Sequence, residues 1–111
     1  MASTSTSSTV FLATHLTFTG ENYDYWIVKM RLFFKANDLW EIVENGFEPR
    51  REGEQYTKAQ LRVLKENEIK DAKALAHIHN ALVDSILPRI IRVSTVKEGW
   101  AVLYEEFQGT T

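Results

Sequence analysis

The chain of 111 residues contains no cysteine, which excludes a disulfide, a thiolate nucleophile and any zinc or iron–sulfur site built on cysteine. Positive charge is also scarce, because 13 lysine and arginine residues are outnumbered by 15 aspartate and glutamate residues. A protein that binds the nucleic-acid backbone usually carries a clear positive excess, so this balance disfavours nucleic-acid binding. No apolar run approaches the ~20 residues that span a membrane, and the N-terminus lacks the pattern of a secretory signal. We therefore expect a cytoplasmic protein, with access to the nucleus left open, that has no membrane partner.

The sequence patterns of catalysis and of metal binding are missing as well. The five glycines are scattered, so there is no glycine-rich phosphate loop, and no serine stands in a Gly-x-Ser-x-Gly motif. His77 and His79 are two residues apart, a spacing at which side chains on a helix point to different sides. Most carboxylates lie in a charge-mixed predicted helix or near helix N-termini, where they cap the helix or favour its dipole. We therefore expect no enzymatic activity, no metal site and no cofactor.

The residues that are present indicate one small domain preceded by a tail. Hydrophobic residues make up 44% of the chain and charged residues 25%, as is usual for a soluble globular protein. Residues 1–9 are almost entirely serine, threonine and alanine, and they cannot bury enough apolar area to offset the entropy of ordering. The sequence therefore predicts a disordered tail over residues 1–9 and a folded domain over residues 10–109.

The domain begins with a segment in which apolar residues share one face at period two. Such a pattern predicts a short extended segment over residues 10–19, with Gly20 as the turn that follows it. An exposed, regular strand can pair with another chain, so this segment is the candidate site for protein interaction. Either it packs in cis over the helices as a hydrophobic cover, or it is exchanged with a neighbouring chain. The candidate interaction residues are Val10, Leu12, Leu16 and Phe18.

Helical periodicity and capping residues dominate the rest of the chain. Capping pairs are predicted at Asp38 with Glu41, Thr57 with Gln60, and Thr95 with Glu98, and Asn22 and Gly46 are predicted to begin and end helices. The predicted helices span residues 23–36, 38–45, 58–83, 85–92 and 96–107. Five helices with short connections predict an all-α fold, a compact helical bundle.

Each predicted helix has an apolar stripe, and the stripes together define a predicted core. Tyr25 lies off the stripe of the first helix and is expected near solvent. The predicted core residues are Tyr23, Trp26, Ile27, Met30, Phe33, Trp40, Leu75, Leu82, Trp100, Leu103 and Phe107. The first half of the long helix is charge-mixed and predicted to be solvated on its outside, and its second half is predicted to be the central core helix. The residues predicted to lie along one face of this helix are Leu61, Leu64, Glu68, Ala72, Leu75, His79 and Leu82, widened by Ala76, Ile78 and Val83.

Two groups of basic residues keep a nucleic-acid patch open as a third and less favoured interpretation. Charge runs of this kind usually form a solvated helix face. The groups are Arg50, Arg51, Lys58, Arg62 and Lys65, and then Arg89, Arg92 and Lys97.

Five blocks of residues, in order, resemble a known family. They are Phe18-x-Gly20-x-Asn22-Tyr23-x-x-Trp26-x-x-x-Met30, Ala36-x-Asp38-Leu39-Trp40-Glu41-x-Val43-x-x-Gly46, Asp71-Ala72-Lys73-Ala74-Leu75, Asp84-Ser85-Ile86-x-Pro88-Arg89-Ile90, and Thr95-x-Lys97-Glu98-x-Trp100-x-x-Leu103-x-x-Glu106-Phe107-Gln108-Gly109. The chain in this region resembles the N-terminal part of the gag polyprotein of plant copia-type LTR retrotransposons, which is similar to the N-terminal lobe of a retroviral capsid protein.

The resemblance implies a structural protein that associates with copies of itself in a particle. The zinc knuckle that binds RNA in the family lies further on, so the resemblance implies no nucleic-acid partner for this segment. A domesticated host copy is the alternative, in which the domain binds a host protein or a peptide in a hydrophobic groove. Gly99 departs from the family pattern, which has alanine or a similar helix former there, and it either loosens the last helix or permits a close contact.

Overall fold

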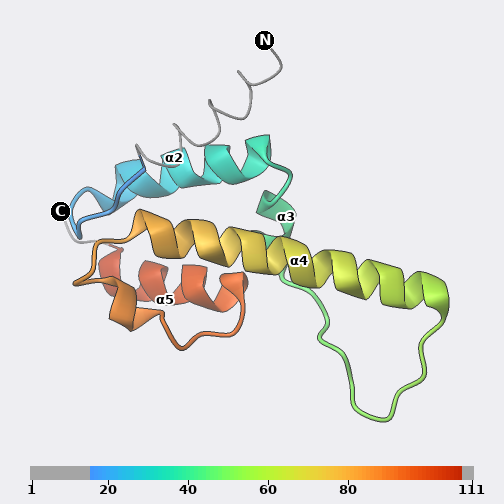
Figure 1. The fold of residues 1–111 in the computed structure, drawn as a ribbon. Helices are drawn as coiled ribbons and strands as arrows, with labels where there is room; N and C mark the ends of the chain where they lie inside the picture. The colour runs from blue at the N-terminus through green and yellow to red at the C-terminus, as the bar shows by residue number, and fades with distance from the viewer. Residues whose placement is uncertain (1–15, 109–111) are drawn as a thin grey trace.

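The computed structural model describes residues 16–108 as an all-α bundle built around one long helix, as Figure 1 shows. The predicted fold class is therefore confirmed. The predicted tail and two of the candidate interaction residues, Val10 and Leu12, lie outside the described residues. The elements are α2 Tyr23–Ala36, α3 Trp40–Asn45, α4 Lys58–Ala81, a 3-10 helix η1 Leu87–Arg89, and α5 Val96–Phe107.

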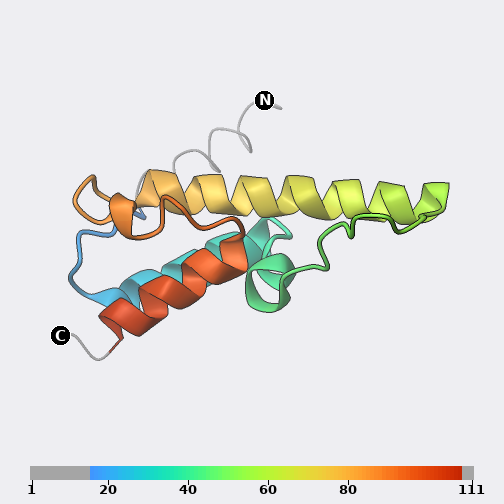
Figure 2. The same cartoon turned by 90° about the horizontal axis from the view of Figure 1, so that it is seen from below.

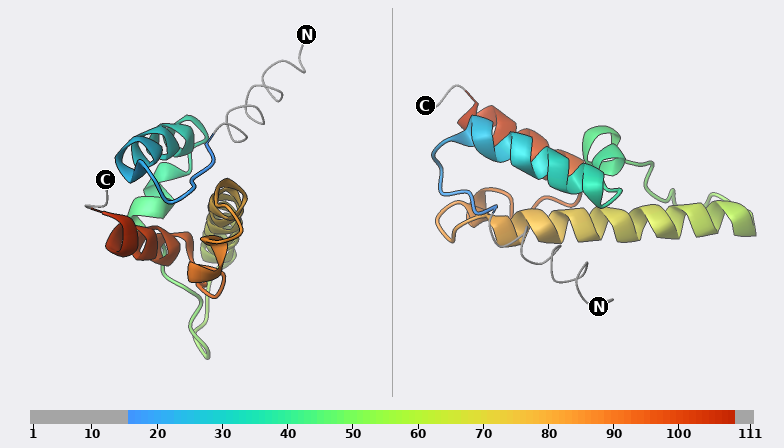
Figure 3. Two further views of the ribbon diagram at one scale, coloured as in Figure 1. Left: turned by 90° about the vertical axis from the view of Figure 1, so that its left-hand side faces the viewer. Right: turned by 90° about the horizontal axis from the view of Figure 1, so that it is seen from above.

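Three helices lie along one another, and the short α3 lies where α2 ends, beside the middle part of α4 (Figures 1 and 2). Seen nearly end-on in the left panel of Figure 3, α2, α4 and α5 occupy the corners of a triangle. The N-terminal part of α4 and the loop before it extend beyond the bundle, as Figure 2 shows from below. No helix among residues 16–108 is both long and apolar enough to cross a membrane.

Aromatic rings fill the space between α2 and α5. The ring of Trp100 on α5 lies 5.8 Å from Trp26 and 5.9 Å from Phe34 on α2, and 5.7 Å from Trp40 on α3. Ring pairs at these separations stabilise a core beyond the area that they bury. Among the predicted core residues, Tyr23, Trp26, Met30, Phe33, Leu82 and Leu103 are buried, whereas Ile27, Trp40, Leu75, Trp100 and Phe107 are partly buried against the core.

Two of the predicted side-chain caps are wrong. Asn22 and Asp38 adopt left-handed backbone conformations, with φ of 57° and 58°, and α3 begins after Leu39 rather than after Asp38. Neither Asn22 nor Leu39 caps its helix with a side-chain hydrogen bond. Asn22 does stand at the N-cap position of α2, as predicted, but only its backbone oxygen takes part, accepting from the amide of Trp26 at 3.1 Å. Asparagine and aspartate tolerate the left-handed region better than other non-glycine residues, which suits Asn22 and Asp38 to these turns.

The other predicted ends agree better with the structure. Thr57 and Gln60 form both hydrogen bonds of a capping box at the start of α4. The hydroxyl of Thr95 accepts a hydrogen bond of 3.3 Å from the amide of Glu98 at the start of α5. Gly46 ends α3 with φ of 71°, in the region that favours glycine.

The predicted helix over residues 85–92 is wrong, because only the three residues of η1 are helical there. Successive amides bond three residues back, as from Arg89 to Ile86 and from Ile90 to Leu87. Pro88 supplies no amide hydrogen, and the chain must turn back from α4 to α5 within this segment. Ile90 is nevertheless fully buried, so the turns still contribute to the core.

The buried face of α4 also differs from the predicted one. The buried residues are Asp71, Ala74, Ile78 and Ala81, about one residue around the helix from the predicted stripe. Ala72 is exposed and His79 is only partly buried. The helix also ends at Ala81 rather than Val83, because the backbone at Leu82 turns away to pair with Phe18.

Gly99 permits a close contact between α5 and its neighbours. A Cβ atom at this position would lie 3.3 Å from Cγ2 of Val93 and 3.5 Å from Cδ1 of Leu75. The first distance is tighter than an ordinary van der Waals contact. The glycine therefore lets the start of α5 pack closely on α4 and on the turn before it.

Candidate functional site

Within the described part of the N-terminal segment, residues 16–18 form a strap between α2 and the end of α4. The indole Nε1 of Trp26 donates a hydrogen bond of 2.7 Å to the backbone oxygen of Leu16. The amide of Phe18 donates to the oxygen of Ala81 at 2.6 Å, and the amide of Val83 donates to the oxygen of Phe18 at 3.2 Å. The strap thus pairs in parallel with the residues that follow α4.

The side chain of Phe18 ties the strap into the aromatic core. Its ring stacks on Trp26 at 4.8 Å and meets Phe107 edge-on at 5.0 Å and Tyr23 at 5.8 Å. Burial raises the pKa of Tyr23 to about 12. Among the candidate interaction residues, Leu16 and Phe18 are therefore both buried against their own chain.

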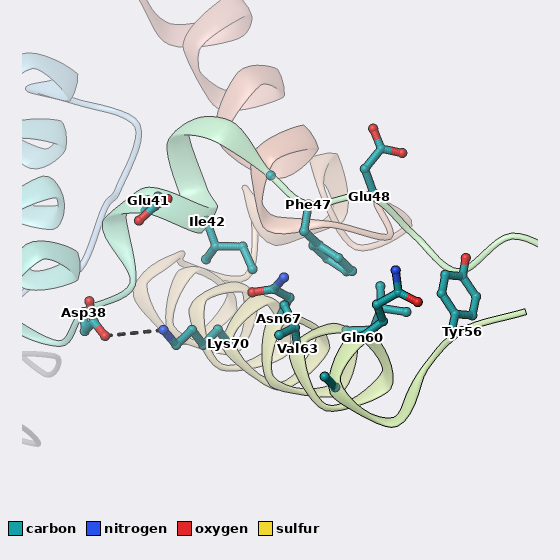
Figure 4. A pocket seen from close by; sticks show the side chains of 13 residues that line it. Asp38, Glu41, Ile42, Phe47, Glu48, Tyr56, Gln60, Val63, Asn67 and Lys70 are labelled. Atoms are coloured by element: carbon teal, nitrogen blue, oxygen red, sulfur yellow. Dashed lines mark hydrogen bonds and ion pairs between the residues drawn. The ribbon is translucent and has the colours of Figure 1, made fainter.

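A groove of about 630 Å³ lies between α3, the loop that follows it and the N-terminal part of α4. Figure 4 shows Ile42 and Phe47 above α4, with Val63 below them. An ion pair of 3.3 Å between Lys70 and Asp38 marks one end of the groove. The remaining lining residues are Glu41, Gly46, Glu48, Tyr56, Ala59, Gln60, Leu64 and Asn67.

The outer face of α2 carries an apolar stripe that we call the α2 stripe, formed by Tyr25, Val28 and Leu32. These side chains are 73%, 51% and 61% exposed, and they follow one another at i, i+3 and i+7. The sequence pattern predicted only Tyr25 near solvent, and the stripe as a surface was not predicted. The signal was present, because all three residues lie off the buried face of the same helix.

The buried titratable groups serve the fold rather than a reaction. Asp71 on α4 is 5% exposed, and its Oδ1 accepts a hydrogen bond of 3.0 Å from the amide of Val96. Burial raises the pKa of the Asp71 carboxyl, and this hydrogen bond opposes the rise. Burial also lowers the pKa of His77, whose ring meets Phe33 edge-on at 4.8 Å. No group of three or more potential metal ligands gathers within residues 16–108.

Several residues of the two basic groups are paired with carboxylates. Arg50 donates to Glu68 with two hydrogen bonds of 3.0 and 3.2 Å, which tie the loop after α3 to α4. Arg89 pairs with Glu106 at 2.7 Å, and Arg51 pairs with Glu48. Because these arginines are paired with carboxylates, the surface around them carries less net positive charge than the two basic groups in the sequence suggest.

These features define a small helical domain that carries an apolar stripe on α2 and a groove beside the N-terminal part of α4. Residues 30–111 match the family of the gag-polypeptide of LTR copia-type, and the match spans more than half of the chain. The chain therefore belongs to the copia-type gag family, which is structural and not enzymatic. Comparisons with curated proteins and with solved structures gave no match. The matched region begins within α2, so the strap precedes it.

Proposed function

We propose that this gag domain associates with further copies of itself and so contributes to the assembly of the element's particle in the cytoplasm. The observation that supports the proposal most is the α2 stripe. Scattered apolar side chains are normal on a protein surface, but apolar residues aligned along one helix favour an interaction site. Membership of the copia-type gag family supports the same conclusion.

The proposal assigns the contact to the outside of a closed domain. Leu16 and Phe18 already contact their own chain, so they would have to leave the core before they could reach another chain. Exchange of the strap between chains could rebuild the same contacts across two molecules. We propose the simpler route, in which the strap stays in place and the outer helix surface associates.

The mass of the chain in solution tests the proposal. We expect the mass to rise with concentration in size-exclusion chromatography with light scattering, both for the full chain and for a variant that lacks residues 1–15. This deletion spares Leu16 and Phe18, so it leaves the described core intact. A monomer at every concentration, with no particles in electron micrographs, would contradict the proposal. If the full chain associated and the deletion variant did not, the contact would be assigned to residues 1–15 instead of the α2 stripe.

The groove between α3 and α4 supports a second candidate function, the capture of a peptide from a host protein. It combines apolar side chains with amide and charged groups at its rim, as peptide-binding grooves do. An amphipathic peptide with apolar anchors fits this chemistry. Such a function suits a domesticated copy of the gene.

A peptide display library gives a direct test of the groove. We expect the wild-type chain to enrich peptides with apolar anchors and the Val63→Glu variant to lose them, because Val63 lines the groove and is 55% exposed. Ile91→Glu is the matched control, since Ile91 is similarly exposed at 49% but does not line the groove. Absence of enrichment, or peptides that bind the Val63→Glu variant equally well, would count against this function.

A further inference from the structure

We propose that two copies of the chain pair through α2, with the helices antiparallel about a two-fold axis and the α2 stripes facing each other. The inference rests on the proposed self-association and identifies the surface that performs it. The partner that covers the α2 stripe is a second copy of this chain.

Within residues 16–108, the position of α2 leaves one long face open for such a contact. The helix lies at one corner of the bundle, and α4 and α5 are both on its inner side (Figures 1 and 3). Its 14 residues extend over about 21 Å at ~1.5 Å per residue. The inner face buries Trp26, Met30 and Phe34, so the α2 stripe is on the opposite face.

The charges at the ends of α2 favour an antiparallel pair. Asp24 lies in the first turn and Lys35 in the last turn. Eleven residues separate them, which is about three helical turns, so both lie along the same edge of the α2 stripe. Neither residue takes part in an ion pair within residues 16–108.

The proposed two-fold axis is perpendicular to α2. Rotation about it reverses the direction of the helix, but each edge of the α2 stripe stays on the same side of the pair. Asp24 of each copy is then brought toward Lys35 of the other, so both charges are matched twice. A parallel pair would place equal charges level with each other. The antiparallel pair also sets the positive end of each helix dipole beside the negative end of the other.

The apolar residues match under the same symmetry. Tyr25, near one end of the α2 stripe, comes opposite Leu32 of the second copy, and Val28 lies near the axis close to its own counterpart. A large ring thus meets a branched aliphatic side chain at both ends. Lys29 lies on the opposite edge, where its long side chain reaches solvent.

The expected contact is weak. One helix packed on one helix buries well below the ~800 Å² per partner of a standard stable interface. Such a pair forms at high local concentration and dissociates on dilution. Contacts of this strength suit an assembly in which each copy is also held by other neighbours.

Light scattering and sedimentation of the wild type and of surface variants test the inference. Leu32→Glu should weaken self-association by at least about tenfold, because two-fold symmetry places the substitution twice in each interface. Ile91→Glu is the matched control, since Ile91 is 49% exposed outside α2, and we expect it to associate as the wild type does. Circular dichroism of each variant verifies that the fold is retained.

Charge reversal separates pairing from a mere effect on folding. Asp24→Lys and Lys35→Asp should each weaken association, whereas the double variant should restore it, because the two charges exchange places across the axis. Loss of helix stability at α2 cannot produce such a rescue. Failure of the double variant to recover, while both single variants are impaired, would overturn the antiparallel arrangement.

Two further outcomes would overturn the inference in distinguishable ways. If the wild type and Leu32→Glu self-associated equally strongly, pairing through α2 would be contradicted. The proposed self-association itself would still hold. A wild type that stays monomeric, yet binds phosphatidylserine–phosphatidylcholine vesicles through Leu32, would assign the α2 stripe to a lipid surface. That second result would remove the proposed self-association together with the α2 pair.

Discussion

Phe18→Ala is expected to lower the free energy of unfolding by about 3–5 kcal/mol, the usual cost of removing a buried phenylalanine ring. Phe18 is 1% exposed and contacts three other rings, so a cavity would open where the strap, α2 and α5 meet. A small domain is stabilised by about 5–15 kcal/mol in total. The substitution would therefore remove a large fraction of the stability, although Phe18 precedes the first helix.

Urea denaturation measures this effect, with tryptophan fluorescence as the signal because Trp26 stacks on Phe18. Phe18→Leu should cost less than about 1.5 kcal/mol, since most of the apolar volume remains. Thr19→Ala is the control, because Thr19 is exposed and immediately adjacent in sequence. If Phe18→Ala and Thr19→Ala shifted the midpoint equally, the strap would not be part of the core in solution.

The first helix and the aromatic core could be predicted from the sequence, because the spacing of the rings fixes one face of a helix. Tyr23, Trp26 and Met30 recur at helical intervals, and all three are buried on the same face of α2. Thr57 was also predictable as a cap, because the hydrogen bonds of a capping box are local.

The buried face of α4 could not be predicted, because much of this helix does not pack against the bundle. Its N-terminal part extends beyond the other helices (Figure 2), and Leu61, Val63 and Ile69 are exposed there. Without burial to enforce it, the apolar pattern of this half carries no information about the inner face. In the other half a carboxylate occupies the inner face, and a hydropathy pattern assigns Asp71 to the outside.

Some features of the candidate surfaces could likewise be predicted from the sequence, whereas others could not. The period of the N-terminal segment indicated its extended form, but the partner of Phe18 is the backbone after α4, more than sixty residues away in sequence. The groove likewise needs α3 and α4 placed side by side, which no local pattern specifies. The α2 stripe could have been predicted from the sequence, since its residues lie on the side of α2 opposite the buried face.

Asp71→Ala is the second substitution with a large expected effect, about 1–3 kcal/mol lost from the free energy of unfolding. The amide of Val96 is among the first N–H groups of α5, which have no acceptor within the helix. Asp71 supplies that acceptor from α4, so one carboxylate both caps α5 and joins two helices. Alanine would leave the buried amide of Val96 without this partner.

Asp71→Asn is expected to be much milder, because the amide side chain keeps an oxygen that can accept the same hydrogen bond. It also removes the cost of burying a charge. If Asp71→Asn lost as much stability as Asp71→Ala, the negative charge rather than the hydrogen bond would be the stabilising feature.

The pH dependence of the wild type and Asp71→Asn separates charge from hydrogen bonding. Burial raises the pKa of the folded carboxyl above its ordinary value of 3.8, so the folded protein holds this proton to higher pH than the unfolded chain does. The contribution of Asp71 to the free energy of unfolding is therefore largest below pH 3.8 and falls as pH rises through the folded pKa. Asp71→Asn removes that decline, so we expect it to gain stability relative to the wild type across this window.

Urea denaturation of the wild type, Asp71→Ala and Asp71→Asn at a series of pH values measures both effects together. Asp84→Asn serves as the control, because it makes the same chemical change at an exposed position. A stability difference between wild type and Asp71→Asn that stays constant across the window would show that burial does not raise the pKa of Asp71. A difference of the opposite sign would mean that the charged carboxylate at the N-terminus of α5 stabilises the fold through the helix dipole more than its burial costs.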